Sequence, residues 1–347
     1  MALGFIPRRP VRSGSVEEDD VRRREFVAAA TAVPLTVALP SAKRVGLGDV
    51  RRLESRFAEI VARDHQFGGI KSVEALALQM AQEALELQDQ GSAGQRVRAA
   101  LYGSAAAFTS SAMWAAIDGR RFDAAQRHLD QAARLATLSG DSAIAFRIWS
   151  HAGSMYRHTG RVSDALAAND VARSLSVARR DPLFASLGHA RHAAILGLGG
   201  DRNAVARALV RAQDALERAD GTAQRPMWLT AFYDQSELES LSLTAYLALR
   251  HHDLAESHAH RCLALLRPGN TRSRAIATAR LARAQLGQRE LDLAVSTALE
   301  IEPTQTSHPR VAGMLRSFGQ RLTELAPRSE AAKTWEQCAT SMREAPE

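Results

Sequence analysis

Apolar residues recur at three- and four-residue spacings along almost the whole chain beyond residue 42. In the segment DVRRLESRFAEIVARDHQFGG, this spacing places one apolar face on a helix, formed by Val50, Leu53, Phe57, Ile60 and Val61. Gly68–Gly69 then ends the periodic run. The alternation of apolar and polar residues that is typical of strands is absent. The pattern therefore predicts an all-α protein.

A second helix is predicted over SVEALALQMAQEALELQDQGSAG, with Ser72 as its N-cap and Gly91 at its end. Beyond it, five blocks share a polar turn followed by a helix that opens with alanine. Aligning these alanines places Ala124, Ala165, Ala204, Ala255 and Ala294 in register. The one long interval contains the loop DGTAQRP, from Asp220 to Pro226. Such internal similarity indicates stacked helical repeats.

One block defines the class of repeat. Counted back from the aligned alanine, its residues match the signature offsets of a tetratricopeptide (TPR) repeat at Trp149, Gly153, Tyr156, Ala165 and Ala172. Gly153 and Ala165 are small where the two helices of the repeat cross, and Trp149 and Tyr156 fill the gaps around them. We expect an α-solenoid of TPR-like antiparallel helical pairs with lengthened helices. The alternative is a generic alanine-rich bundle.

The pattern also divides the chain. Residues 1–20 are rich in Pro, Gly, Ser and charge and are expected to form a disordered tail. Residues 21–48 are expected to be a linker with an apolar segment, residues 49–103 the N-terminal helices of the array, and residues 104–345 the TPR-like repeats.

The amino-acid composition restricts the possible folds and functions only slightly. The 347 residues carry a net charge of +7, which permits loose attraction to nucleic acid without arguing for it. Aromatic residues make up only 5%, which suits closely packed helices better than a β-sandwich. The two cysteines, Cys262 and Cys338, cannot form a disulfide framework. No run of 18 or more apolar residues is present, so no membrane span is expected.

The sequence contains no motif of a known catalytic class: no P-loop, GxGxxG, HExxH, CxxC or GxSxG. His258 and Cys262 have the i, i+4 spacing that can hold a transition metal, and His189 and His192 have i, i+3 spacing. Packing and solvated helix faces explain all four without a metal. We expect neither an enzyme nor a metal or other cofactor.

A binding site follows better from repeat geometry, because the first helices of stacked pairs line a concave groove. Transferring TPR groove positions to this chain selects Met113, Arg147, Ser154, Arg157, His189, Glu237, Ser240 and Thr244. Two arginines on such a surface could clamp a carboxylate or phosphate, although pairing with a neighbouring repeat explains them as well.

The chain resembles the C-terminal regulatory region of TPR-bearing helix-turn-helix transcriptional regulators of the XRE class. The resemblance covers about residues 20–300 and rests on VRRREFVAAA, ARDHQFGG, DGRRFDAAQRHLDQAARLATLSGD, RPMWLTAFYDQSELESLSL and RSRAIATARLARAQLGQRELDLA. It implies a cytoplasmic sensor and dimerisation module that binds a protein, a peptide or a small signalling ligand in its groove. The 20 residues before Val21 are too few for a helix-turn-helix domain, which takes about 55–65 residues. Direct DNA binding by this chain is therefore not expected.

Two alternatives remain open. RRREFVAAATAVPLTVALPSA, from Arg22 to Ala42, has the look of a twin-arginine export signal, which predicts an exported TPR scaffold. The acidic residues 17–20 and the position of Pro40 argue against export. If the start of the chain is misassigned, the protein is instead a complete DNA-binding regulator.

Overall fold

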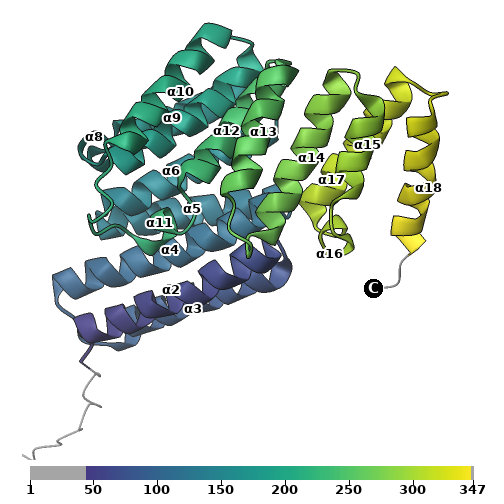
Figure 1. The fold of residues 1–347 in the computed structure, drawn as a ribbon. Helices are drawn as coiled ribbons and strands as arrows, with labels where there is room; N and C mark the ends of the chain where they lie inside the picture. Colours follow the sequence, from purple (N-terminus) through teal and green to yellow (C-terminus); the bar gives the residue numbers. More distant parts are fainter. Residues whose placement is uncertain (1–43, 345–347) are drawn as a thin grey trace, which may run out of the picture. The chain divides into compact units, whose positions relative to one another are not determined.

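The computed structural model describes residues 44–344. In this range the chain forms helices joined by turns and loops, and it contains no strand beyond a single β-bridge between Arg44 and Ser92. Neighbouring helices pack as antiparallel pairs (Figure 1). The predicted all-α solenoid of helical pairs is confirmed.

The first two helices are α2 (Leu47–Phe67) and α3 (Lys71–Gln90). The apolar face predicted for the first is buried at Val50, Leu53, Phe57 and Ile60, whereas Val61 is only partly buried. Gly68, at φ 62°, ends α2. The prediction of Ser72 as an N-cap is wrong: α3 begins at Lys71, so Ser72 lies inside the helix, and the N-cap is Ile70 without a side-chain hydrogen bond.

Further helices follow in pairs, with short helices between some of them. The pairs are α4 (Gln95–Asp118) with α5 (Phe122–Ser139), α6 (Ser142–His158) with α7 (Val162–Ser174), α9 (Pro182–Leu196) with α10 (Arg202–Glu217), α12 (Gln235–Ala248) with α13 (His252–Leu265), α14 (Thr271–Gly287) with α15 (Leu291–Leu299), and α17 (Pro309–Leu325) with α18 (Glu330–Glu344). The short elements are α8 (Ser176–Arg180), η1 (Gly197–Gly199), α11 (Met227–Thr230) and α16 (Pro303–Thr306).

Five of these pairs share one turn geometry. A residue with positive φ lies between the two helices, and the fourth residue of the second helix is completely buried five positions later. The positive-φ residues are Arg120, Gly160, Gly200, Arg250 and Arg289. The buried residues, which we call the landmarks, are Ala125, Ala165, Val205, Ala255 and Ala294. This corrects the alignment made from sequence by one position in two blocks, because Ala124 and Ala204 are only partly buried.

The close helix crossing expected at Gly153 is present. A Cβ atom added at Gly153 would lie 3.2 Å from the backbone oxygen of Ala165. Ala165 and Ala172 are completely buried, and Trp149 and Tyr156 pack at the edge of the main core. The small residues therefore permit close approach of α6 and α7.

The long interval between the third and fourth landmarks contains an insertion. It comprises the loop predicted at Asp220–Pro226 and the short helix α11. Trp228 of α11 is buried in the main core, and Phe232 just beyond it contacts the ring of His65 on α2, with 4.6 Å between ring centroids. The insertion thus packs back onto the first helix.

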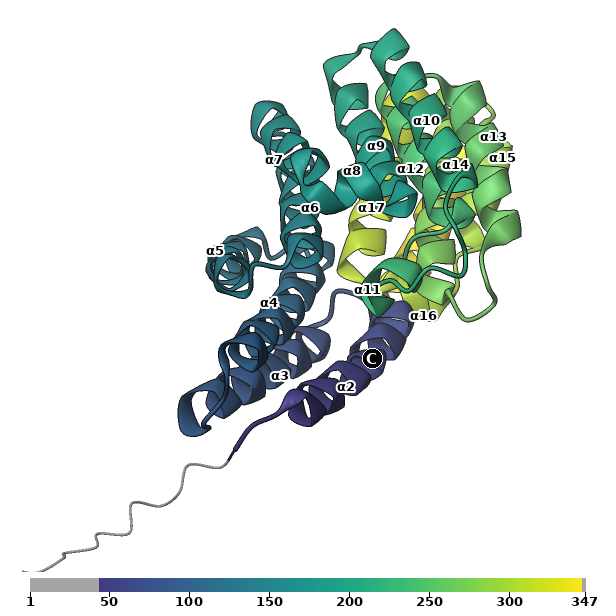
Figure 2. The same cartoon turned by 90° about the vertical axis from the view of Figure 1, so that its left-hand side faces the viewer.

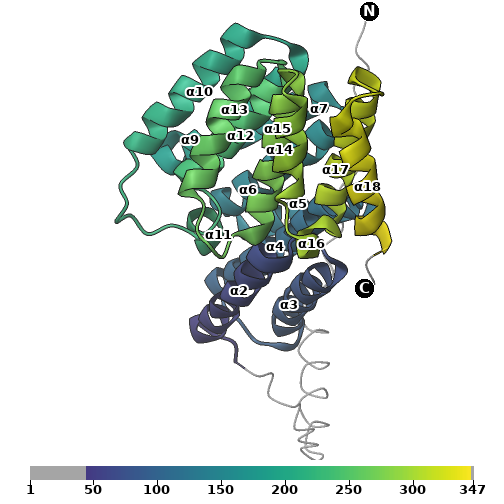
Figure 3. The ribbon, with the colours of Figure 1, turned by 45° about the vertical axis from the view of Figure 1, so that its right-hand side comes forward.

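The first described helix meets helices of the later pairs. Figures 2 and 3 show α2 beside the region where α14 and α16 begin, and side chains of α14 contact α2 directly. The boundary expected at residues 103/104 falls inside α4, which runs through it without a break. The expected tail and all but the end of the expected linker lie outside the described residues. No helix among the described residues is long and apolar enough to cross a membrane.

Candidate ligand-binding site

Two adjoining cavities lie among the first helices of successive pairs. Both are lined by residues of α4, α6, α9, α12 and α14, and they share Trp114, Arg191, Glu237 and Arg272. Their volumes are about 110 and 80 Å³. A space of this size holds several water molecules or the head of a small ligand.

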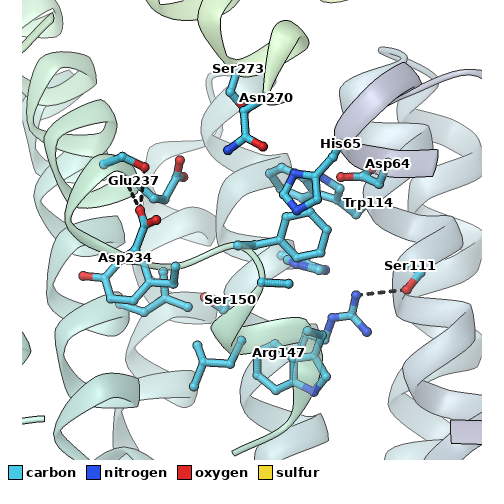
Figure 4. Close-up of a pocket in the computed structure, with 18 of the residues that line it drawn as sticks. Asp64, His65, Ser111, Trp114, Arg147, Ser150, Asp234, Glu237, Asn270 and Ser273 are labelled. Carbon is cyan, nitrogen blue, oxygen red and sulfur yellow. Dashed lines mark hydrogen bonds between the residues drawn. The ribbon is translucent and has the colours of Figure 1, made fainter. Parts of the chain in front are cut away.

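The larger of the two, which we call the aromatic cavity, has apolar rings in its wall. Trp114, Phe146, Trp228, Phe232 and Tyr233 line it, and α2 contributes Asp64 and His65. Figure 4 shows side chains from α2, α4, α6 and α12 around the same space, with Arg147 bonded to Ser111. A wall that combines rings with a few polar groups is typical of small-molecule sites.

The smaller one, which we call the arginine cavity, is strongly cationic. Glu237 is the one carboxylate in its described lining. Five arginines line it: Arg157, Arg191, Arg272, Arg280 and Arg310. They come from four helices or helix starts that are far apart in the sequence. The repeat stacking therefore concentrates positive charge at one place inside the molecule.

Four of the cavity arginines take part in none of the ion pairs found among residues 44–344. They are Arg147, Arg157, Arg191 and Arg280. Arg147 donates to the carbonyl oxygen of Ala107 and the hydroxyl of Ser111, each at 2.9 Å, and its Nε has no partner. Arg191 donates to the Ser150 hydroxyl at 2.8 Å. Arg280 donates to the Ser240 hydroxyl at 3.1 Å. The hydrogen-bond acceptors of these side chains are neutral, so no direct ion pair balances their charge, and Asp64 and Glu237 offset it only from a greater distance.

The electrostatic cost of this arrangement is visible in the pKa values. Burial, together with the charges of Arg310 and Arg157, lowers the pKa of Arg280 to about 9. Burial and neighbouring arginines also lower the pKa of Arg157 to about 10. Burial raises the pKa of Glu237, although three arginines oppose this. A guanidinium with a pKa of about 9 is still charged at neutral pH, so the cavity stays cationic.

A buried cluster of ion-paired residues lies next to the two cavities. Arg272 of α14 bonds Asp118 of α4 and, at 3.1 Å, Asp64 of α2. Arg310 and His308 also contact the Asp118 carboxylate, at 2.9 and 3.2 Å. Burial alone would raise the pKa of Asp118, but Arg272, His308 and Arg310 together hold it well below its usual range. This cluster joins α2, α4, α14 and the start of α17.

The histidines in the cavity walls are neutral at pH 7. Burial, with Arg191 and Arg147 nearby, holds the pKa of His151 well below its usual value. Burial and Arg157 do the same for His158, and burial lowers the pKa of His65. The positive charge of the site therefore comes from its arginines.

The structure brings together five of the eight groove residues selected from sequence: Arg147, Ser154, Arg157, Glu237 and Ser240 all line the two cavities. The other three lie elsewhere. Met113 is completely buried in the main core, Thr244 is buried and bonds the Ser240 carbonyl, and His189 lines neither cavity. Correcting the repeat register by one replaces Met113 with Trp114, which lines both cavities.

Sequence reasoning missed Arg191, Arg272, Arg280 and Arg310. A signal for two of them exists in the corrected register. In each of the five pairs, the residue fourteen positions before the buried landmark residue lines one of the cavities. These residues are Ser111, His151, Arg191, Leu241 and Arg280. Arg272 and Arg310 carried no such signal, because they reach the site through contacts across 154 and 192 residues.

The histidine pairs considered as metal ligands have other contacts. His258 bonds Glu239 at 2.6 Å and stacks on Tyr246, with 5.2 Å between centroids. Cys262 is buried against Leu266 and Ala277, and burial raises the pKa of its thiol to about 12. His192 lies beside Asn169, and His189 Nδ1 has no partner. Among the residues described, no group of three or more His, Cys, Asp or Glu has the arrangement of a metal site.

The sequence matches no protein-family model and no curated protein at a significant level.

Proposed function

We propose that this chain is the ligand-sensing, TPR-like module of a transcriptional regulator, and that it works in the cytoplasm. The observation that carries the proposal is the pair of adjoining cavities between the first helices of the repeats, where arginines face aromatic rings. Stacked helical pairs place binding surfaces on this face. The resemblance to XRE-class regulators suggests the regulatory role.

The geometry also suggests how binding is sensed. Helices from five of the pairs contribute to both cavities, and the ionic cluster beside them joins α2 to α14. A ligand that contacts several of these helices stabilises one arrangement of them over others, because it binds that arrangement more tightly. The partner that responds is a DNA-binding protein or domain, and the response is a change in contact with it or in dimerisation.

The proposal is tested by replacing the chromosomal gene with an allele that encodes the full chain with Trp114→Ala and Arg191→Ala. The transcripts of this strain are compared with those of wild type and of a gene deletion. We expect the double variant to alter a defined set of genes that overlaps the set altered by the deletion.

A matched allele carries Arg207→Ala, since Arg207 is exposed on α10 and lines neither cavity. It should leave transcription unchanged. An unchanged transcript profile in the deletion strain would refute the regulatory role. Changes in the deletion strain alone, with soluble double variant present at wild-type level, would refute the role of the cavities.

A further inference from the structure

We propose that the two cavities together bind a small molecule with a phosphate headgroup, which lies in the arginine cavity, and an aromatic or apolar body, which lies in the aromatic cavity. This inference deepens the proposed sensing function and rests on it for its biological meaning. Its chemistry stands on the described residues alone.

The charge balance of the site favours binding of an anion. Six arginines line the two cavities: Arg147, Arg157, Arg191, Arg272, Arg280 and Arg310. Asp64, Asp234 and Glu237 are the carboxylates in the same lining, and Asp118 pairs with Arg272 and Arg310 from beside it. The excess among these groups is two positive charges, carried by arginine side chains that are buried or half-buried. A buried charge without a partner is costly, and a bound anion removes this cost.

The charge and the arrangement favour phosphate over a single carboxylate. A phosphate monoester carries nearly two negative charges at neutral pH and presents three oxygens. Arg157, Arg191 and Arg280 line the arginine cavity from three different helices, which suits a tetrahedral group because its oxygens point in several directions. A carboxylate carries one charge and has one planar edge, which suits one or two arginines.

The hydrogen bonds that Arg157 and Arg280 already make leave some of their N–H groups free to bind a phosphate. The one hydrogen bond found for Arg157 joins its Nη2 to His158, whose pKa is held low by burial and by Arg157 itself. Among residues 44–344, Arg280 donates its hydrogen bonds to oxygens of Ser240, and its pKa is lowered because burial and other arginines disfavour its charge. Each guanidinium has five N–H donors, so both keep donors for a ligand.

The aromatic cavity fits the rest of the molecule. Trp114 lines both cavities, and the guanidinium of Arg191 lies 5.7 Å from its ring centroid. Trp228 and Phe232 face the same space. A ligand with a ring or an apolar chain attached to its phosphate gains contact with these side chains, whereas inorganic phosphate alone does not.

The test is isothermal titration of the full chain with four probes at constant ionic strength: phenyl phosphate, phthalate, inorganic phosphate and phenol. Phenyl phosphate supplies both parts, phthalate replaces phosphate with two carboxylates, and the last two supply one part each. We expect phenyl phosphate to bind at least about tenfold more tightly than any of the others, and its affinity to fall as salt is raised.

Two variants locate the binding. Arg280→Met and Arg157→Met remove a cavity charge with little loss of volume, and each should weaken phenyl phosphate binding by about tenfold or more. Arg207→Met on the exposed face of α10 is the matched control and should bind like wild type. The melting temperature without ligand should not fall in Arg280→Met, because Arg280 makes no ion pair among residues 44–344 and the neighbouring Arg157 and Arg310 disfavour its charge. That readout separates loss of a ligand contact from loss of folding.

The outcomes are distinct from failure of the proposed function. Equal or tighter binding of phthalate overturns the phosphate headgroup and leaves ligand sensing intact. Binding of phenol alone, or unchanged affinity in both arginine variants, overturns the anionic site. Binding of none of the four probes also overturns this inference, whereas the transcript experiment decides the regulatory role independently.

Discussion

Arg272 on α14 bonds the carboxylate of Asp118 on α4, 154 residues earlier in the chain. The Asp118 side chain is fully buried, and Arg310 and His308 contact it as well. The backbone N–H of Gly69 also donates to this carboxylate, at 3.2 Å. One carboxylate therefore ties the beginning of the array to its later helices and fixes one side of the cavities.

Asp118→Asn should strongly destabilise the fold. The substitution preserves shape but leaves Arg310 without its carboxylate and Arg272 with Asp64 alone. Removing one partner of a buried ion pair costs about 3–5 kcal/mol. Urea unfolding followed by circular dichroism measures the free energy of unfolding.

The control for this experiment is Glu324→Gln, which breaks an exposed pair with Arg321 on α17. Exposed pairs contribute about 0–1 kcal/mol, so this variant should unfold like wild type. Equal stability of the two variants would show that the buried cluster does not hold the helices together.

Gly153→Val should destabilise the crossing of α6 and α7. A Cβ at this position already lies 3.2 Å from the Ala165 backbone oxygen, and valine adds two further methyl groups. Overpacking of this kind costs about 1–3 kcal/mol. Gly103→Val on α4 is the matched control, because its nearest contact would be 3.7 Å away. A smaller loss of stability at Gly153 than at Gly103 would contradict the close packing.

The helical class and the paired repeats could be predicted from sequence because they depend on local signals. Spacing of apolar residues defines helix faces, and the turns between blocks contain glycine or polar residues. In two blocks the register could not be set to better than one residue, because DAAQ and NAVA each offer two adjacent apolar residues. Burial selects Ala125 and Val205, and the positive-φ turn residues five positions earlier agree with this choice.

The site was only partly predictable for a different reason. Arg147, Arg157 and Glu237 follow from repeat positions, since each repeat presents the same face. Arg272 and Arg310 reach the cavities because the later helices pack against α2 and α4, and no local pattern encodes that contact. The excess positive charge of the site depends on which carboxylates lie within reach, and this is visible only in three dimensions.

Stability in acid should depend on Glu239. Burial would raise the pKa of this carboxyl, but hydrogen bonds from His258 and Arg261 outweigh burial and lower it to about 2. A lowered pKa stabilises the fold above the ordinary carboxyl pKa of about 4.5, and this contribution is lost as the pH falls toward 2. It amounts to about 2–3 kcal/mol.

In Glu239→Gln the free energy of unfolding should therefore depend less steeply on pH between about 4.5 and 2. Urea titrations at several pH values compare the slopes. A residual slope is expected in the variant, because the pKa of Asp118 is also lowered. Parallel curves for the variant and wild type would contradict the ion pairs of Glu239.

The two cysteines should differ sharply in reactivity. Cys262 is 2% exposed, and burial raises its pKa to about 12, whereas Cys338 on α18 is partly exposed. The thiolate is the reactive form, so Cys262 is protected both by burial and by protonation. Treatment of the native chain with iodoacetamide at pH 8 should modify Cys338 and spare Cys262, as read by peptide mass spectrometry. In urea both should react at similar rates. Equal modification in the native state would show that α13 opens readily, which would also expose the arginine cavity that Cys262 lines.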